Sequence, residues 1–174
     1  ATDIVSFDPL PYAEKTSDRT PYEEGVESTY TMRGDLIEYS ILISNPSIRY
    51  EWLGVKLTDA LPEGLTLVEG LYNSKNYEVK VKVTDTDGIV SNYVVPKDAP
   101  SGSDPYYYEY SKATSDGETD SDLVVYLGDM PVADENTGAM RTIEVIFTAI
   151  PDRRAVSLFP LNDPANIVAN GDNI

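Results

Sequence analysis

Apolar and polar residues alternate along several segments of this chain, and this period of two constrains the fold more than any other feature. Residues 77–84 read Tyr-Glu-Val-Lys-Val-Lys-Val-Thr, so an extended segment would have one apolar and one polar side. A similar alternation runs through 36–44, 53–59 and 141–149, and it places Leu53 on the apolar side of its segment. Helices show a period of 3.6, whereas half-buried antiparallel strands show a period of two. The chain is therefore predicted to be all-β.

Turn residues separate the predicted strands. Asp87–Gly88 lies between two alternating segments and favours a tight turn, which predicts a β-hairpin there. Segments 45–47 (Asn-Pro-Ser) and 61–64 (Leu-Pro-Glu-Gly) close the two preceding strands. Twelve prolines leave little room for helices. Short strands separated by turns predict an immunoglobulin-like antiparallel β-sandwich.

The length of 174 residues suits a single domain, 1–174, with two less regular regions. Residues 1–30 hold three prolines and are interpreted as an extended leader and first strand. Residues 98–122 carry seven acidic residues and one lysine, a net charge of −6, together with four tyrosines. We interpret this stretch as a long acidic, tyrosine-rich loop inserted between sandwich strands. No apolar run approaches the length of a membrane span, so no direct membrane insertion is expected, and a signal peptide or anchor would lie outside this fragment.

Charge and composition exclude many function classes. The chain has 13 basic and 30 acidic residues, a formal charge of −17, and neither histidine nor cysteine. Nucleic acids and anionic membranes would be repelled. Ser-His and Cys-His nucleophiles, thiol redox chemistry and nearly all zinc, copper, haem and iron–sulfur sites are lost. We therefore expect a protein that is not an enzyme and that needs no cofactor, calcium being the one candidate.

Three segments carry a family resemblance. Residues 34–45 run from Gly-Asp through an alternating strand to an Asn-Pro turn, and 55–65 continue with Asp-Ala-Leu-Pro-Glu-Gly-Leu. Residues 125–130 and 142–149 resemble closing strands. In order and spacing the chain resembles the tandem repeat domain of unknown function number eleven. That family occurs in bacterial surface and cell-wall proteins and is similar to pilin and adhesin sandwich domains.

The resemblance implies a function outside the cell. It points to a non-catalytic structural or adhesive module of a cell-wall or pilus-like protein at the bacterial surface, serving as a stalk or as a domain that binds the host or its matrix. Its expected partners are neighbouring domains of the same protein, host glycans or extracellular-matrix proteins. The alternative is a carbohydrate-binding module of a secreted enzyme, which would share the sandwich fold.

The similar pilin and adhesin domains contain an internal Lys–Asn isopeptide bond, and the resemblance implies candidates for one here. They are Lys15 near the first strand, Asp59 on the core side of its strand, and Asn162 or Asn166 near the last strand, residues 165–169. A buried lysine is driven towards its nucleophilic neutral amine, and a buried acid can carry the proton. In the alternative interpretation, Lys15 is exposed, Asp59 caps the following turn, and both asparagines serve loops.

Aromatic residues are candidates for ligand binding. Four tyrosines follow a Ser-Gly-Ser segment, a composition typical of adaptable binding loops, and Trp52 lies near another turn where it could stack on a sugar ring. Alternatively, every second tyrosine is buried in the sandwich. The candidates in this group are Trp52, Tyr106, Tyr107, Tyr108 and Tyr110.

Alternating acids form a candidate calcium site. Calcium takes six to eight oxygen ligands, and the acidic stretch offers Asp116, Glu118, Asp120 and Asp122. Their spacing does not match an EF-hand, and a solvated acidic loop is the alternative interpretation.

Overall fold

The computed structural model of the chain describes residues 12–18, 36–61, 65–99, 105–115 and 118–151. Within these ranges the protein is all-β, as predicted, and has no helix, hence none that could cross a membrane. The strands are β1 (Tyr12–Ser17), β2 (Ile37–Ser44), β3 (Trp52–Leu61), β4 (Leu65–Leu67), β5 (Gly70–Tyr72), β6 (Lys75–Tyr77), β7 (Lys80–Thr84), β8 (Val90–Val94), β9 (Tyr107–Ser115), β10 (Glu118–Met130) and β11 (Thr142–Pro151).

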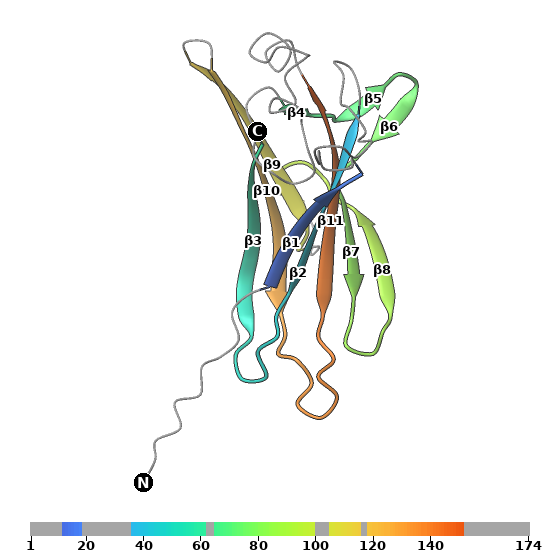
Figure 1. The fold of residues 1–174 in the computed structure, drawn as a ribbon, viewed down its shortest axis with the longest axis vertical. Coiled ribbons are helices and arrows are strands. Elements are labelled where there is room, and N and C mark those ends of the chain that lie inside the picture. Colours follow the sequence, from blue (N-terminus) through green and yellow to red (C-terminus); the bar gives the residue numbers. More distant parts are fainter. Residues whose placement is uncertain (1–11, 19–35, 62–64, 100–104, 116–117, 152–174) are drawn as a thin grey trace, which may run out of the picture.

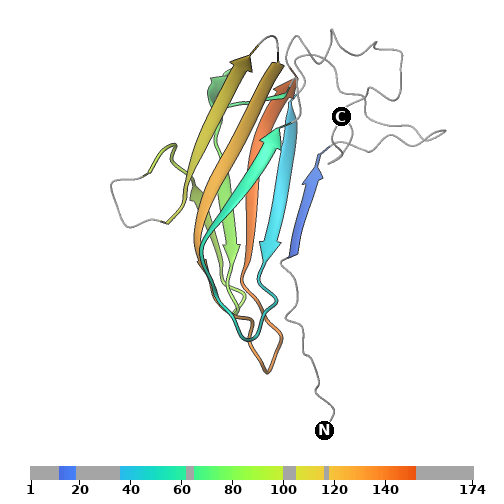
Figure 2. The ribbon, with the colours of Figure 1, turned by 90° about the vertical axis from the view of Figure 1, so that its left-hand side faces the viewer.

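Two antiparallel sheets face each other in a sandwich-like arrangement (Figures 1 and 2). The six-stranded sheet, called sheet A, has the order β1-β2-β11-β7-β8, with β4 pairing to the end of β11. The three-stranded sheet, called sheet B, has the order β3-β10-β9. Strands β5 and β6 form a separate small hairpin. The last described strand, β11, therefore lies in the middle of sheet A, between β2 and β7.

The hydrophobic core lies between the two sheets and follows the predicted alternation. In β7, Val81 and Val83 are buried, whereas Lys80 is exposed and Lys82 is partly exposed. Sheet B contributes alternate residues of β10. Burying one valine, leucine, isoleucine or phenylalanine side chain contributes about 1.5–3 kcal/mol to the free energy of unfolding. The largest buried core side chains include Phe147, Ile37, Leu65, Leu123, Leu127, Met130 and Ile143.

The predicted hairpin at Asp87–Gly88 is present and joins β7 to β8. Gly88 has a φ of 82°, which a glycine adopts without steric cost. The amide of Asp85 donates to the carbonyl of Ile89 at 2.9 Å and so closes the turn.

The predicted alternation fails at the start of β3. Leu53 was expected on the apolar side with Val55 and Leu57, but 69% of its surface is exposed. Gly54 has a φ of 59°, and the register between β3 and β10 shifts on both sides of Gly128. Such bulges turn the strand, so Leu53 points outward while Trp52 packs partly against the core.

The acidic stretch 98–122 differs from the predicted loop. It contains β9 and the first residues of β10, which pair with each other as an antiparallel hairpin. Tyrosine has a high preference for strands, and the alternation of Tyr108 and Tyr110 with Glu109 gives β9 an inward apolar side. The acidic composition of the stretch is typical of a loop, although its residues alternate with the period of two of a strand.

Candidate functional site

Lys15 and Asp59 link the two sheets along one side of the sandwich. Lys15 pairs with the buried Ile41 across β1 and β2, so its side chain points towards sheet B. Asp59 pairs with the buried Leu123 across β3 and β10, so it points towards sheet A. The Lys15 Nζ lies 2.7 Å and 3.0 Å from the two carboxylate oxygens of Asp59. The side chains retain 24% and 11% of their exposure, so the pair is largely shielded from water.

Two stacked aromatic rings lie next to this ion pair. The Lys15 Nζ lies 4.8 Å from the centre of the Tyr39 ring, and this ring stacks on Phe147 at 5.4 Å. A cation above a ring face is attracted by its negative quadrupole. Burial raises the pKa of Tyr39 to about 12, with smaller contributions from the negative charges of Asp59 and Asp18. Tyr39 therefore stays neutral at physiological pH.

The raised pKa of Tyr39 predicts an alkaline loss of stability. In the unfolded chain this phenol ionises near its ordinary pKa of 10, whereas in the folded protein it holds its proton to about 12. The folded state then binds more protons, so the free energy of unfolding falls as the pH rises from 10 to 12. Urea denaturation of Tyr39→Phe at a series of pH values should show a shallower decline than the wild type. Equal slopes would contradict this prediction.

The structure thus brings together two of the four candidate isopeptide residues. Asp59 is 9% exposed and lies on the core side of its strand, as the alternation indicates. The interpretation in which Lys15 is free in solvent does not describe it, because its amine contacts Asp59 and Tyr39. Asn162 and Asn166 lie outside the described residues. Chemically, the arrangement holds the Asp59 carboxylate close enough to accept a proton from the Lys15 amine.

The tyrosine candidates separate into two environments. Tyr106 and Tyr108 belong to the hydrophobic core, and the Tyr110 hydroxyl accepts a hydrogen bond from the Leu67 amide at 3.2 Å. Burial, together with the hydrogen bond to Glu69, raises the pKa of Tyr108. These three tyrosines are packed, as expected if every second one faces the core.

Tyr107 lies on the opposite, outer side of sheet B. Its ring stacks on that of Tyr126 with centres 4.0 Å apart, and the Tyr126 hydroxyl donates to Glu109 at 3.1 Å. Sequence reasoning missed Tyr126 because its position opposite Tyr107 depends on the register of β9 and β10. Trp52 is partly buried, whereas its neighbour Tyr50 is 63% exposed.

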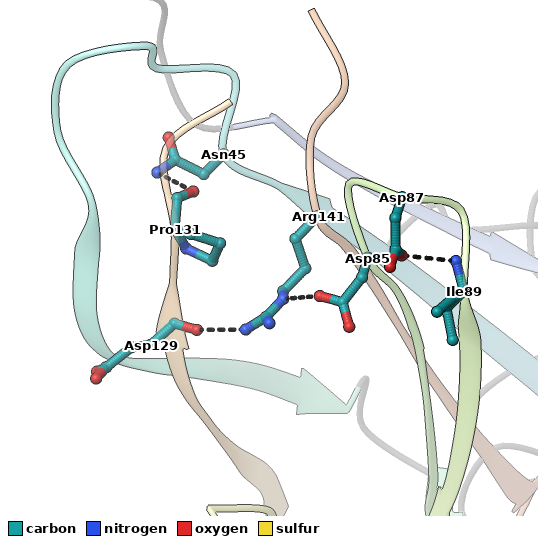
Figure 3. Close-up of polar contacts among 7 residues, drawn as sticks. All are labelled: Asn45, Asp85, Asp87, Ile89, Asp129, Pro131 and Arg141. Atoms are coloured by element: carbon teal, nitrogen blue, oxygen red, sulfur yellow. Dashed lines mark hydrogen bonds and ion pairs between the residues drawn. The ribbon is translucent and has the colours of Figure 1, made fainter. Parts of the chain in front are cut away.

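Three loops meet at the lower end of the sandwich in Figure 1 and are tied together by polar contacts (Figure 3). Asn45 is fully buried, and its amide nitrogen lies 3.2 Å from the carbonyl oxygen of Pro131. Arg141 donates to Asp85 at 2.6 Å and to the carbonyl of Asp129 at 3.2 Å. These contacts join the loops after β2, β7 and β10. The end of the sandwich is therefore a fixed surface, and it exposes Tyr50.

The candidate calcium ligands do not form a site that the structure describes. Asp116 lies outside the described residues, Glu118 and Asp120 are placed only by the backbone of β10, and Asp122 is exposed on this strand. Across the described ranges, no group of three or more acidic side chains is arranged to hold a metal ion.

A comparison with protein families, curated proteins and solved structures finds no match to this chain. The resemblance to the tandem repeat domain therefore stays an expectation based on its sequence motifs.

Proposed function

We propose that this chain is a non-catalytic structural or adhesive module of a bacterial surface protein, with an immunoglobulin-like sandwich. In this proposal it lies outside the cell, in series with neighbouring domains, and carries tension as part of a stalk or of a matrix-binding domain. The geometry of β1, β2 and β11 is the observation that carries the proposal.

Tension along the chain would load these strands in shear. Strands β1 and β11 both pair antiparallel with β2, so they run in the same direction on its two sides. Strand β1 begins at the lower end of the sandwich and β11 ends at the upper end (Figure 2). Because the ladder hydrogen bonds lie perpendicular to the strands, a pull along the long axis strains many of them at once. Such an arrangement resists force better than one whose bonds open one by one.

The Lys15–Asp59 pair adds to this resistance. Strand β1 lies at the edge of sheet A and pairs with β2 alone among the described strands. The ion pair fastens β1 to sheet B as well. A force that peels β1 away must therefore also break a shielded charge–charge contact.

Single-molecule force spectroscopy tests the proposal. We expect the unfolding force to be clearly higher when the protein is pulled from its two ends than when it is pulled through cysteines introduced by Thr86→Cys and Glu135→Cys. Both of these exposed residues lie in turns at the lower end of the sandwich, so this second pull opens the ladders of sheet A one bond at a time. The chain has no cysteine of its own, so attachment is specific. Equal forces in the two directions would contradict a load-bearing role.

A carbohydrate-binding module is the alternative proposal, and the stacked Tyr107–Tyr126 pair on the outer side of sheet B favours it. Aromatic side chains with a carboxylate beside them, here Glu109, provide stacking and hydrogen bonding for a sugar. Glycan-array binding that is lost in Tyr126→Ala, but kept in Trp52→Phe, would support the module over the stalk.

A further inference from the structure

Strand β8 is an exposed and uncharged edge of sheet A. Its sequence is Val-Ser-Asn-Tyr-Val, and no described strand pairs with its outer side. Val90 is 49% exposed and Val94 is 58% exposed, and Ile89 just before the strand is 61% exposed. An open, uncharged strand edge is a ready template for pairing with another chain.

The outer strands β1, β3 and β9 of the two main sheets are protected. Strand β1 carries Glu14 and Lys15, and β3 carries Lys56 and the bulge at Gly54. In β9, the outer backbone of Tyr108 is already bonded to residues 96 and 98. Charges, bulges and covering segments are the usual means by which proteins prevent edge pairing. Within the described part of the chain, β8 has none of them.

The hydrogen bonds between β7 and β8 show which backbone groups face outward. The amide of Val95 donates to Val79, and the carbonyl of Ile89 accepts from Asp85. Because the pattern alternates along an antiparallel pair, the odd-numbered residues of β8 bond to β7. The backbone groups of Val90, Asn92 and Val94 therefore point away from the sheet.

Charge does not prevent a second copy of the chain from reaching this edge. The chain has a net charge of −17, so two copies repel each other over most of their surface. Strand β8 has no charge, and its neighbour β7 presents Lys80 and Lys82 on the same outer face. Lys82 is held by Glu144 at 3.1 Å. A second acidic copy can approach this edge without meeting a concentration of negative charge.

We propose that two copies of this chain associate through β8, antiparallel and centred on Asn92, to form one continuous sheet. Val90 of each copy then lies opposite Val94 of the other, and the two Asn92 side chains face each other across the two-fold axis. The outward groups of Val90, Asn92 and Val94 form six backbone hydrogen bonds. The two Lys82 side chains stay about 14 Å apart, three strand spacings, which exceeds the screening length of about 8 Å at physiological salt.

The proposed dimer is weak. A five-residue strand pairing buries less than the roughly 1,600 Å² of a standard interface, so we expect a dissociation constant on the order of 10–100 µM. Sedimentation equilibrium of the full chain over a range of concentrations should show reversible dimers above this value. A monomer at all concentrations up to 1 mM, roughly ten times the weaker limit, would overturn the proposal.

A proline at the centre of β8 tests the geometry. Asn92→Pro removes an outward amide and leaves the bonds to β7 in place, because proline is tolerated at a free edge. We expect its dissociation constant to rise at least tenfold, whereas Asn92→Ala, which keeps the amide, should change it less than threefold. Dimers of Asn92→Pro as strong as those of the wild type would place the contact elsewhere and overturn the proposal.

Hydrogen exchange gives a second measurement that needs no variant. The amides of Val90, Asn92 and Val94 should exchange more slowly at 500 µM than at 5 µM protein, two concentrations that lie roughly on either side of the expected constant. The amides of Ser91 and Tyr93, already bonded to β7, should change little. Equal exchange of the outward amides at both concentrations would also overturn the proposal.

Discussion

Replacing Asn45 by alanine is expected to lower the free energy of unfolding by about 2–4 kcal/mol. Asn45 is fully buried, and its amide nitrogen lies within 3.4 Å of the carbonyl oxygens of Tyr50, Met130 and Pro131. Its side-chain oxygen accepts the Ser47 amide at 3.0 Å. Alanine would remove these contacts from a fully buried position. For a domain of this size, such a loss lowers the melting temperature by roughly 5–15 °C.

Urea denaturation and calorimetry measure this effect, and Asn92→Ala is the matched control. Asn92 is exposed on β8, so its truncation should cost less than about 0.5 kcal/mol. Asn45→Asp should be at least as damaging as Asn45→Ala, because it removes the donor and buries a charge. An Asn45→Ala variant as stable as the control would show that the loops after β2 and β10 hold together without the Asn45 side chain.

The fold class could be predicted from the sequence because the period of two is a local property. Val81 and Val83 face the core and Lys80 faces solvent, as their alternation indicates. The prediction failed at Gly54, where a bulge interrupts the alternation of inward and outward side chains. Leu53 therefore points outward. The prediction also failed in the acidic stretch, where the high net charge indicates a loop but the alternation of the tyrosines is that of a strand, β9.

The candidate site was predictable only as far as side-chain direction. The alternation along β3 predicts that Asp59 points to the core side. The structure adds its contact with Lys15. That contact depends on how β1 docks against β2, which no local pattern specifies. The Tyr107–Tyr126 pair and the Asp85–Arg141 ion pair likewise join residues far apart in sequence. In the sequence, only the types of these residues, aromatic or charged, indicated such pairs.

The resemblance to pilin and adhesin domains predicts an isopeptide bond from Lys15 to Asn162 or Asn166, and with this bond the intact protein would weigh about 17 Da less than its sequence. The lysine amine attacks the asparagine side-chain carbonyl carbon, the new C–N bond replaces the bond to the amide nitrogen, and ammonia leaves. Asp59, within 3.0 Å of the amine, takes the amine proton and passes it to the leaving group. Intact-mass spectrometry measures the loss, and a cross-linked peptide after digestion identifies the asparagine. A mass equal to that of the sequence would leave Lys15 and Asp59 as an ion pair only.

Variants separate the covalent bond from the ion pair. Asp59→Asn should restore the full mass, because it removes the proton carrier, and Lys15→Met should do so because it removes the nucleophile. Lys80→Met, a lysine change on an exposed position of β7, should keep the loss of 17 Da, roughly one ammonia. The bond would close a loop spanning most of the chain, and by the chain-entropy estimate for covalent cross-links its absence costs about 5 kcal/mol. A partly exposed ion pair contributes no more than about 1 kcal/mol. A loss of stability near 5 kcal/mol in both variants, together with the change in mass, would therefore identify a covalent link that holds β1 in place under load.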